Sequence, residues 1–192
     1  MNLFLAAHAA ASRWQDAAAA CLAQLGTIPA PANVGFLYVT DALASSLPDI
    51  LAYLQTHTGV VHWTGTVGTG ICASGREYHD QPAMSLMLGS FPAEHFRMLP
   101  ALTDNLDSFV QSERSWLDQH DYHFGIVHGD PRNMELPQLL GKVGDAVRGV
   151  FLVGGLASSR QSYAQIVDGI TEDTLSGILF DAQIPVATAL TQ

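Results

Sequence analysis

The sequence contains few charged residues and very few cysteines. Only 14% of its 192 residues are charged, and 8 lysines and arginines stand against 18 acidic residues, which gives a formal net charge of −10. A surface with so few basic groups repels phosphate backbones and anionic lipids, so we expect neither nucleic acid nor a membrane as a partner. Cys21 and Cys72 are too few for a disulfide framework or a four-cysteine zinc site, and we expect reduced thiols.

Several signatures of catalysis and targeting are also missing. The sequence has no G-x-S-x-G motif and no P-loop lysine, and the glycines at 65–70 lack the spacing of a dinucleotide fingerprint. The apolar start at 1–11 has no basic leading segment and is soon followed by Arg13, so it predicts neither a signal peptide nor a membrane span. We expect a cytoplasmic protein without catalytic activity. A hydrolase that uses Cys72 or His128 is the enzymatic alternative.

Hydrophobic residues make up 48% of the chain, which suits one globular domain over residues 1–192. The low charge indicates that part of the apolar surface is covered by a second subunit, a further domain or a ligand. A homo-oligomer, or a purely structural dimerisation and interaction module, is therefore one interpretation of the composition.

A repeated pattern is the main positive feature of the sequence. The segment 38–68 recurs 89 residues later without a gap. The matching identities are Asp41, Leu47, Pro48, Leu51, Val61 and Gly65 with Asp130, Leu136, Pro137, Leu140, Val150 and Gly154. This pattern predicts two duplicated units, at about 34–95 and 123–190, in which Asp41 and Asp130 are equivalent.

Each unit is predicted to be a strand, a helix, a strand, a glycine turn and a further strand. The predicted strands are 35–40, 60–64, 84–88, 124–128, 149–153, 175–180 and 186–190, and the predicted helices are 12–25, 48–56, 99–117 and 136–147. Residues 74–81 are expected to form a polar loop. The alternation predicts an α/β (α+β) fold with parallel crossovers and with mixed sheets covered by helices. One continuous sheet and two stacked sheets both remain open.

Four segments of the chain resemble the N-terminal domain of the FIST family. They are GFLYVTD at 35–41, HWTGTVGTGI at 62–71, LVGGLASS at 152–159 and DGITEDTLSGILF at 168–180. The resemblance implies a cytoplasmic sensory domain of a signal transduction protein that binds a small ligand, with amino acids among the suggestions. It also implies a C-terminal FIST domain or an output domain as a partner. No cofactor is expected, although a subset of the family is described as haem-binding nitric-oxide sensors, which makes a haem gas sensor the alternative.

The candidate ligand site consists of the glycine turns and the polar residues near them. Glycine permits unusual backbone angles and close approach of a ligand, and ligands of open sheets bind outside the carboxyl ends of parallel strands. The predicted ligand-binding residues are Thr40, Asp41, Thr64, Gly65, Thr66, Gly68, His128, Asp130, Gly154, Gly155 and Ser158. The alternative is that these glycines form ordinary tight turns.

The polar members of this set each have a second interpretation. Asp41 and Asp130 either hold an ammonium or hydroxyl group of the ligand or cap the helices that follow them. His128 is a ligand contact, an axial haem ligand or a structural histidine. Arg160 either pairs with a ligand carboxylate or lies free on the surface.

A second group of polar residues has metal-binding side chains. His120, Asp121 and His123 lie close together, but their spacing does not match a helical pair of ligands, and we expect a solvated loop. His62 is expected to share one face of its strand with Thr64, either near the pocket or within the core.

Overall fold

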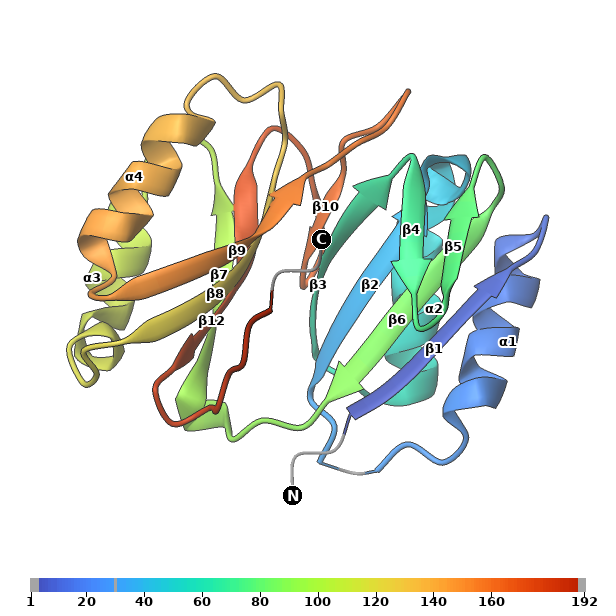
Figure 1. Ribbon diagram of the computed structural model, residues 1–192, viewed down its shortest axis with the longest axis horizontal. Coiled ribbons are helices and arrows are strands. Elements are labelled where there is room, and N and C mark those ends of the chain that lie inside the picture. The colour runs from blue at the N-terminus through green and yellow to red at the C-terminus, as the bar shows by residue number, and fades with distance from the viewer. Residues whose placement is uncertain (1–3, 30, 190–192) are drawn as a thin grey trace.

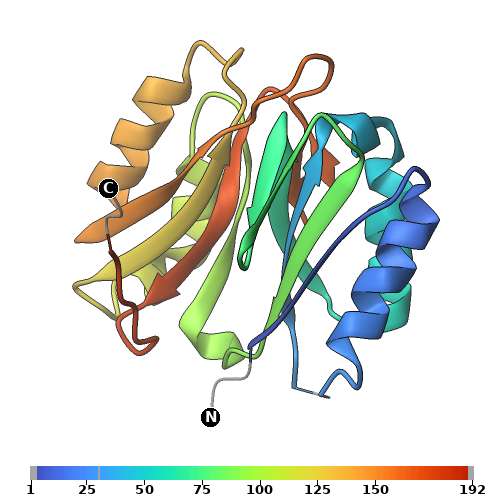
Figure 2. The same cartoon turned by 45° about the vertical axis from the view of Figure 1, so that its right-hand side comes forward.

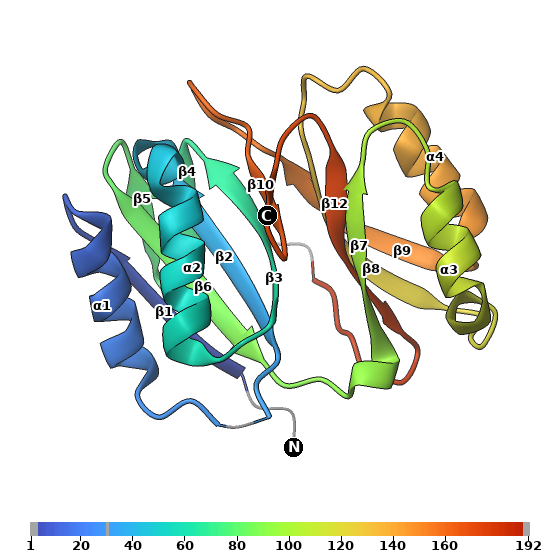
Figure 3. The ribbon, with the colours of Figure 1, turned by 180° about the vertical axis from the view of Figure 1, so that it is seen from behind.

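Two β-sheets pack face to face, and helices cover their outer faces (Figure 1, Figure 3). The structure is a computed structural model that describes residues 4–29 and 31–189. The six-stranded sheet has the order β1-β6-β2-β3-β10-β11, and the four-stranded sheet has the order β7-β12-β8-β9. The predicted α/β class is confirmed, and the arrangement is two stacked sheets.

The first part of the chain forms strands β1 to β6 and helices α1 and α2. Four of these strands belong to the six-stranded sheet, and β4 and β5 form a separate small hairpin. In chain order the elements are β1 (Phe4–Ala10), α1 (Trp14–Leu25), β2 (Val34–Thr40), a 3-10 turn (Asp41–Ser46), α2 (Leu47–Thr58), β3 (His62–Gly68), β4 (Gly70–Ala73), β5 (Arg76–His79) and β6 (Ala83–Gly89). Strands β2 and β3 are parallel, β1 and β6 are antiparallel, and β4 pairs with β5 alone.

The second part follows the same order of elements. They are a short 3-10 turn (Ala93–His95), β7 (Phe96–Leu102), α3 (Asp107–Leu117), β8 (His123–Gly129), α4 (Leu136–Ala146), β9 (Val150–Leu156), β10 (Gln165–Val167), β11 (Ile170–Thr171) and β12 (Leu175–Asp181). Strands β8 and β9 are parallel, as β2 and β3 are, and the last strand again lies between the first and the second. Duplication of one unit is our interpretation of this shared order.

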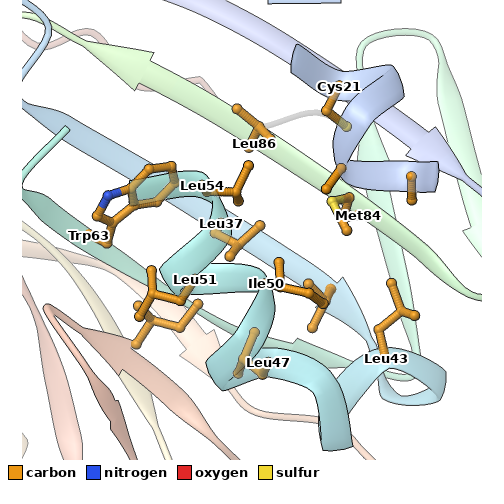
Figure 4. Packing of buried hydrophobic residues seen from close by; sticks show 14 of the residues in the cluster. Cys21, Leu37, Leu43, Leu47, Ile50, Leu51, Leu54, Trp63, Met84 and Leu86 are labelled. Carbon is orange, nitrogen blue, oxygen red and sulfur yellow. The ribbon is translucent and has the colours of Figure 1, made fainter. Parts of the chain in front are cut away.

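Helix α2 shows how the sequence determines the packing on the outer face of the first sheet. Pro48 occupies its first turn and Gly59 ends it in a left-handed conformation, as expected for these residue types. The buried side chains Leu47, Ile50, Leu51 and Leu54 recur at helical spacing and contact the sheet (Figure 4). Trp63 of β3 is fully buried in the same core, and its indole N–H donates to the Val60 carbonyl at 2.9 Å.

The inner faces of the two sheets share a separate core. It contains the buried residues Val34, Phe36, Phe91, Phe96, Ile178 and Phe180. Figure 2 shows the two sheets lying against each other with the helices outside. Each sheet is therefore apolar on both faces, which agrees with the near-continuous apolar runs of β2 and β12.

Three secondary-structure predictions were wrong or incomplete. The predicted helix at 99–117 begins only at Asp107, because residues 99–102 belong to β7, which pairs with β12. Pro100 disfavours a helix interior and is tolerated in an edge strand. Residues 186–189 form no regular strand after Pro185, and residue 190 lies outside the described residues. The expected loop at 74–81 is largely the β4–β5 hairpin, and strands β1, β10 and β11 were not predicted.

The repeat offset of 89 is wrong for the first strand of each unit. Side chains alternate between faces along a strand, so an odd shift moves every side chain to the opposite face. In β2, Leu37 packs into the helix-side core while Tyr38 faces the other sheet. In β8, Val127 lies on the helix side while His128 faces the other sheet. Leu37 therefore corresponds to Val127, and Tyr38 corresponds to His128.

The two glycines keep the offset of 89, but the residues opposite them in the ladders are 90 positions apart. Gly65 lies opposite Leu37 in the β2–β3 ladder, and Gly154 lies opposite Val127 in the β8–β9 ladder. A Cβ atom at either glycine would overlap the carbonyl oxygen of its partner. Asp130 thus corresponds to Thr40, and the predicted equivalence of Asp41 with Asp130 is wrong.

We predict that Gly154→Ala lowers the free energy of unfolding by ~3 kcal/mol, because φ at Gly154 is +146° and the new methyl group would meet the Val127 carbonyl. Gly155→Ala is the matched control, since nothing lies within 4 Å of the Cβ position of Gly155. Urea unfolding of both variants measures the difference. Equal stability of the two variants would contradict this account of the close approach.

Candidate functional site

A cavity of about 320 Å³ lies between the two sheets and the β4–β5 hairpin. Its lining residues are Tyr38, Thr66, Val67, Gly68, Gly70, Ile71, Cys72, Leu156 and Ser158. Strands β2 and β3 end at this edge, and β9 and the segment after it close the other side. The cavity is thus at the carboxyl ends of parallel strands, where ligands bind in open α/β sheets.

The lining of this cavity is apolar with a few uncharged polar groups. The polar side chains are the hydroxyls of Tyr38, Thr66 and Ser158 and the thiol of Cys72. The Thr66 hydroxyl donates to the Ala164 carbonyl at 3.0 Å. No lining residue carries a charge, so the cavity suits a small neutral molecule or the neutral part of a larger one.

A polar cluster connects the two sheets beside the cavity. The Tyr38 hydroxyl lies 3.1 Å from Nε2 of His128, and the Thr64 hydroxyl lies 3.4 Å from Nδ1 of the same ring. His128 is 2% exposed and Thr64 is fully buried. Burial lowers the pKa of His128 to about 4 and raises the pKa of Tyr38 to about 12.

The neutral form of His128 accounts for both contacts. A neutral imidazole has one donor nitrogen and one acceptor nitrogen, and each of the two hydroxyl groups can complement either. An axial bond from His128 to a haem iron would require one of these contacts to break. His128 therefore serves the contact between the sheets, and Tyr38 brings one side of its ring to the cavity.

The segment after β9 fixes the position of Ser158. The N–H of Ala157 donates to the Gly129 carbonyl of β8 at 2.8 Å, while the N–H of Ser158 donates to the Val67 carbonyl of β3 at 3.3 Å. Consecutive residues thus bond to different sheets. The Ser158 hydroxyl in turn accepts the N–H of Thr69 at 3.2 Å, so this segment ties the glycine turn after β3 to the second sheet.

Asp130 belongs to an ion-pair network and caps no helix. Its fully buried carboxylate accepts hydrogen bonds from the side chain and N–H of Arg132 and from the N–H of Asp173. Burial alone would raise the pKa of Asp130, but these hydrogen bonds lower it below its ordinary value. Arg132 also pairs with Glu172 at 2.9 Å and stacks over Tyr163. The capping interpretation of Asp130 is therefore wrong, and its role as a ligand contact stays a prediction.

Asp41 and Arg160 are paired with each other. The Asp41 carboxylate accepts the backbone N–H of Arg160 at 3.3 Å, and the Arg160 guanidinium donates to Asp80 at 2.7 Å. Asp41 therefore does not have the expected capping role. Thr40 is 1% exposed and bonds to the Gln81 carbonyl and the Ala83 N–H, which joins β2 to β6.

The structure brings some of the predicted site residues together and separates others. Thr66, Gly68 and Ser158 line the cavity, and Thr64 and His128 lie in the adjoining polar cluster. Gly154 and Gly155 line a different, apolar cavity of about 390 Å³ beside α4, and Gly65 packs against Leu37. The remaining members, Thr40, Asp41 and Asp130, are bonded elsewhere.

Tyr38 and Cys72 line the cavity but are absent from the ligand-binding residues predicted from the sequence. Tyr38 lies in the segment 35–41 that resembles the FIST family, and strand alternation could have placed its side chain on the face opposite Leu37. Cys72 is exposed in β4, and within the described chain no hydrogen bond links it to a histidine that could activate it. His62 shares the face of Thr64, as predicted, but its Nδ1 lies 2.9 Å from Asp168.

The polar segment at 120–123 does not act as one loop. Asp121 pairs with Arg148 at 3.1 Å on the surface. His123 is 4% exposed in β8, where its Nδ1 contacts the Arg148 carbonyl. His120 instead contacts Asp181 of β12 at 3.2 Å. The expectation of a uniformly solvated loop is therefore wrong.

The fold and the cavity together define an α/β domain of two stacked mixed sheets with a small-molecule-sized space between them. The family model of the FIST N domain matches residues 33–192, so the chain belongs to the FIST family. FIST domains are a sensory domain family of signal transduction proteins. Searches of curated proteins and of solved structures gave no match. Across the described residues, no helix has the length and apolar composition to span a membrane.

We predict that stability falls as the pH is lowered from 6.5 to 4, because the unfolded chain protonates its histidine at position 128 before the folded chain does. The difference between the ordinary pKa of 6.5 and the folded value of about 4 corresponds to on the order of 3 kcal/mol. His128→Gln removes this titration and should flatten the pH dependence of urea unfolding. His79→Gln, at a side chain that is 65% exposed, is the control. Equal slopes for wild type and His128→Gln would contradict the prediction.

Proposed function

We propose that this domain is the ligand-binding sensory part of a cytoplasmic signal transduction protein and that it has no catalytic role. The observation that carries the proposal is the 320 Å³ cavity, which is lined by residues from both parts of the chain. A ligand there contacts Cys72 and Thr66 on one side and Leu156 and Ser158 on the other. Binding would therefore stabilise one relative arrangement of the two sheets.

The β4–β5 hairpin, which lies beside the cavity, offers a way to transmit ligand binding to a partner domain. The β10–β11 hairpin follows β9 and bonds to β3, with Gln165, Ile166 and Val167 opposite Thr66, Gly65 and Thr64. The β4–β5 hairpin follows β3 in the same way, but in the described structure β4 pairs with β5 alone. A ligand between β4 and β9 would draw this hairpin toward the second sheet, and a C-terminal FIST domain or an output domain would respond to that movement.

The uncharged lining restricts the ligand class. The charges of a free amino acid need partners, and none of the lining residues supplies one. The charged residues nearest in sequence are Arg160, two positions after Ser158, and Asp41, three positions after Tyr38. An amino acid fits this proposal if its ammonium and carboxylate reach Asp41 and Arg160, and a neutral metabolite fits without them.

A thermal-shift screen with amino acids and neutral metabolites tests the binding function. A ligand that binds only the folded state raises the unfolding temperature in a concentration-dependent way. Cys72→Trp should fill the cavity and abolish the shift while leaving the unliganded stability nearly unchanged, because Cys72 is exposed. Val61→Trp, at a residue 65% exposed outside the cavity, is the matched control and should keep the shift. A ligand that stabilises the Cys72→Trp variant equally does not bind in this cavity.

The open edge of β9 favours a second candidate function, association with another copy of this chain. Strand β9 ends the four-stranded sheet and contains no charged residue and no proline. Natural edge strands usually carry charge, proline or a covering segment. Phe151 and Leu156 of β9 are 56% and 57% exposed, whereas β3 of the first sheet is covered by β10. We propose that β9 pairs with β9 of a second copy.

We expect Phe151→Lys to convert a dimer into a monomer, because it places a charge on each copy of the paired edge. Light scattering after gel filtration measures the mass. Tyr122→Lys is the control, since Tyr122 is 70% exposed and lies outside β9. A monomeric wild-type protein, or a Phe151→Lys variant that remains dimeric, would rule out this second candidate.

A further inference from the structure

Two histidines and one aspartate converge at the end of the second sheet that is opposite the cavity. Nδ1 of His95 lies 2.9 Å from Oδ2 of Asp181, and Nε2 of His120 lies 3.2 Å from the same oxygen. The three ligand atoms lie within 4.8 Å of one another. The side chain of Asp181 is fully buried, and those of His95 and His120 are 27% and 22% exposed. We propose that these residues form a binding site for a divalent transition metal, with zinc as the best match.

The distances suit tetrahedral coordination. Zinc bonds to imidazole nitrogen and carboxylate oxygen are ~2.0–2.2 Å long, so two ligand atoms of a tetrahedral site are separated by roughly 3.3 Å. The two nitrogen–oxygen distances to Asp181 are close to this separation. A bound ion would lie between the three atoms and replace the two contacts of the histidines with Asp181.

The ligand types select the class of metal. Imidazole nitrogen suits zinc, copper, nickel and iron, whereas magnesium and calcium prefer sites made of oxygen. Two histidines and one carboxylate leave a fourth position for water. The other oxygen of Asp181 accepts the N–H of Gln183 at 2.9 Å, which holds the carboxylate in a fixed orientation, as supporting hydrogen bonds do at metal sites.

The positions of the three metal-binding residues in the chain indicate what a bound ion would do. His95 lies in the 3-10 turn where the chain passes from the first sheet to β7, His120 lies between α3 and β8, and Asp181 ends β12. A bound ion would fasten these three segments together. The site is separate from the cavity, since β8 runs ~20 Å from its start at His123, opposite Asp181, to Gly129 near the cavity side. It therefore stands independently of the proposed ligand-binding function.

Titration of the metal-free protein with Co²⁺ tests the site. Four-coordinate Co²⁺ gives intense visible d–d bands, and we expect these bands to saturate at one equivalent and to disappear when Zn²⁺ is added. Zn²⁺ should also raise the unfolding temperature in a concentration-dependent way. Weak bands typical of six-coordinate Co²⁺, or no bands at all, would overturn the proposal.

Three variants assign the signal to the proposed ligands. His120→Ala and Asp181→Asn should each weaken Co²⁺ binding by at least ~10-fold, since even supporting residues of metal sites have effects of that size. His79→Ala is the matched control, because His79 lies 3.3 Å from Glu77 in an exposed pair on β5 and should not contribute. Circular dichroism checks the fold, and His120→Ala keeps the test valid if the buried Asp181 is needed for folding. Loss of the signal in His79→Ala instead would refute the assignment.

Discussion

Burial of the inner faces of both sheets is the constraint on which the rest of this structure depends. Helices already cover the outer faces, so each inner face can be covered only by the other sheet. Phe91, Phe96 and Phe180 meet there in a shared aromatic cluster, with ring centroids 4.8–6.5 Å apart. Polar groups caught between the sheets must find partners in the same layer, and the contacts of His128 with Tyr38 and Thr64 satisfy this requirement.

The same constraint explains where the cavity lies. The sheets are in close contact around the aromatic cluster, and apolar packing gives way to hydroxyl groups toward the carboxyl ends of β2 and β3. The glycines of the turn after β3 have no side chains that could fill the space, and Ser158 reaches it only because Ala157 and Ser158 bond to different sheets. The cavity is thus a product of the way the two parts of the chain are joined.

The sequence predicted the four helices, although α3 begins eight residues later than expected, and six of the twelve strands of the described chain. It did not give the exact offset between the two units. Helix α2 and strand β2 follow from strong local patterns, and Thr66, Gly68 and Ser158 could be assigned to a site because they lie at or just beyond the carboxyl ends of β3 and β9. The gapless repeat misled because the offset of 89 holds for the buried residues of α2 and α4, whereas β2 and β8 are offset by 90. An alignment without a gap therefore assigns the side chains of the first strands to the wrong faces. Alternation of faces along the strands aligns Leu37 with Val127, which gives the correct offset of 90. The identity of Asp41 with Asp130 instead favours an offset of 89. The cluster of His95, His120 and Asp181 could not be predicted, since its members are far apart in the chain and meet only through the order of strands.

The position of β10 has a consequence for how the chain reaches this structure. Strand β10 is made of residues 165–167, yet it completes the sheet that begins at residue 4. During synthesis from the N-terminus, the edge of β3 stays open until the second sheet has largely emerged. The two halves are therefore expected to fold cooperatively as one unit, and contacts between residues about 100 positions apart place the chain among slower-folding topologies.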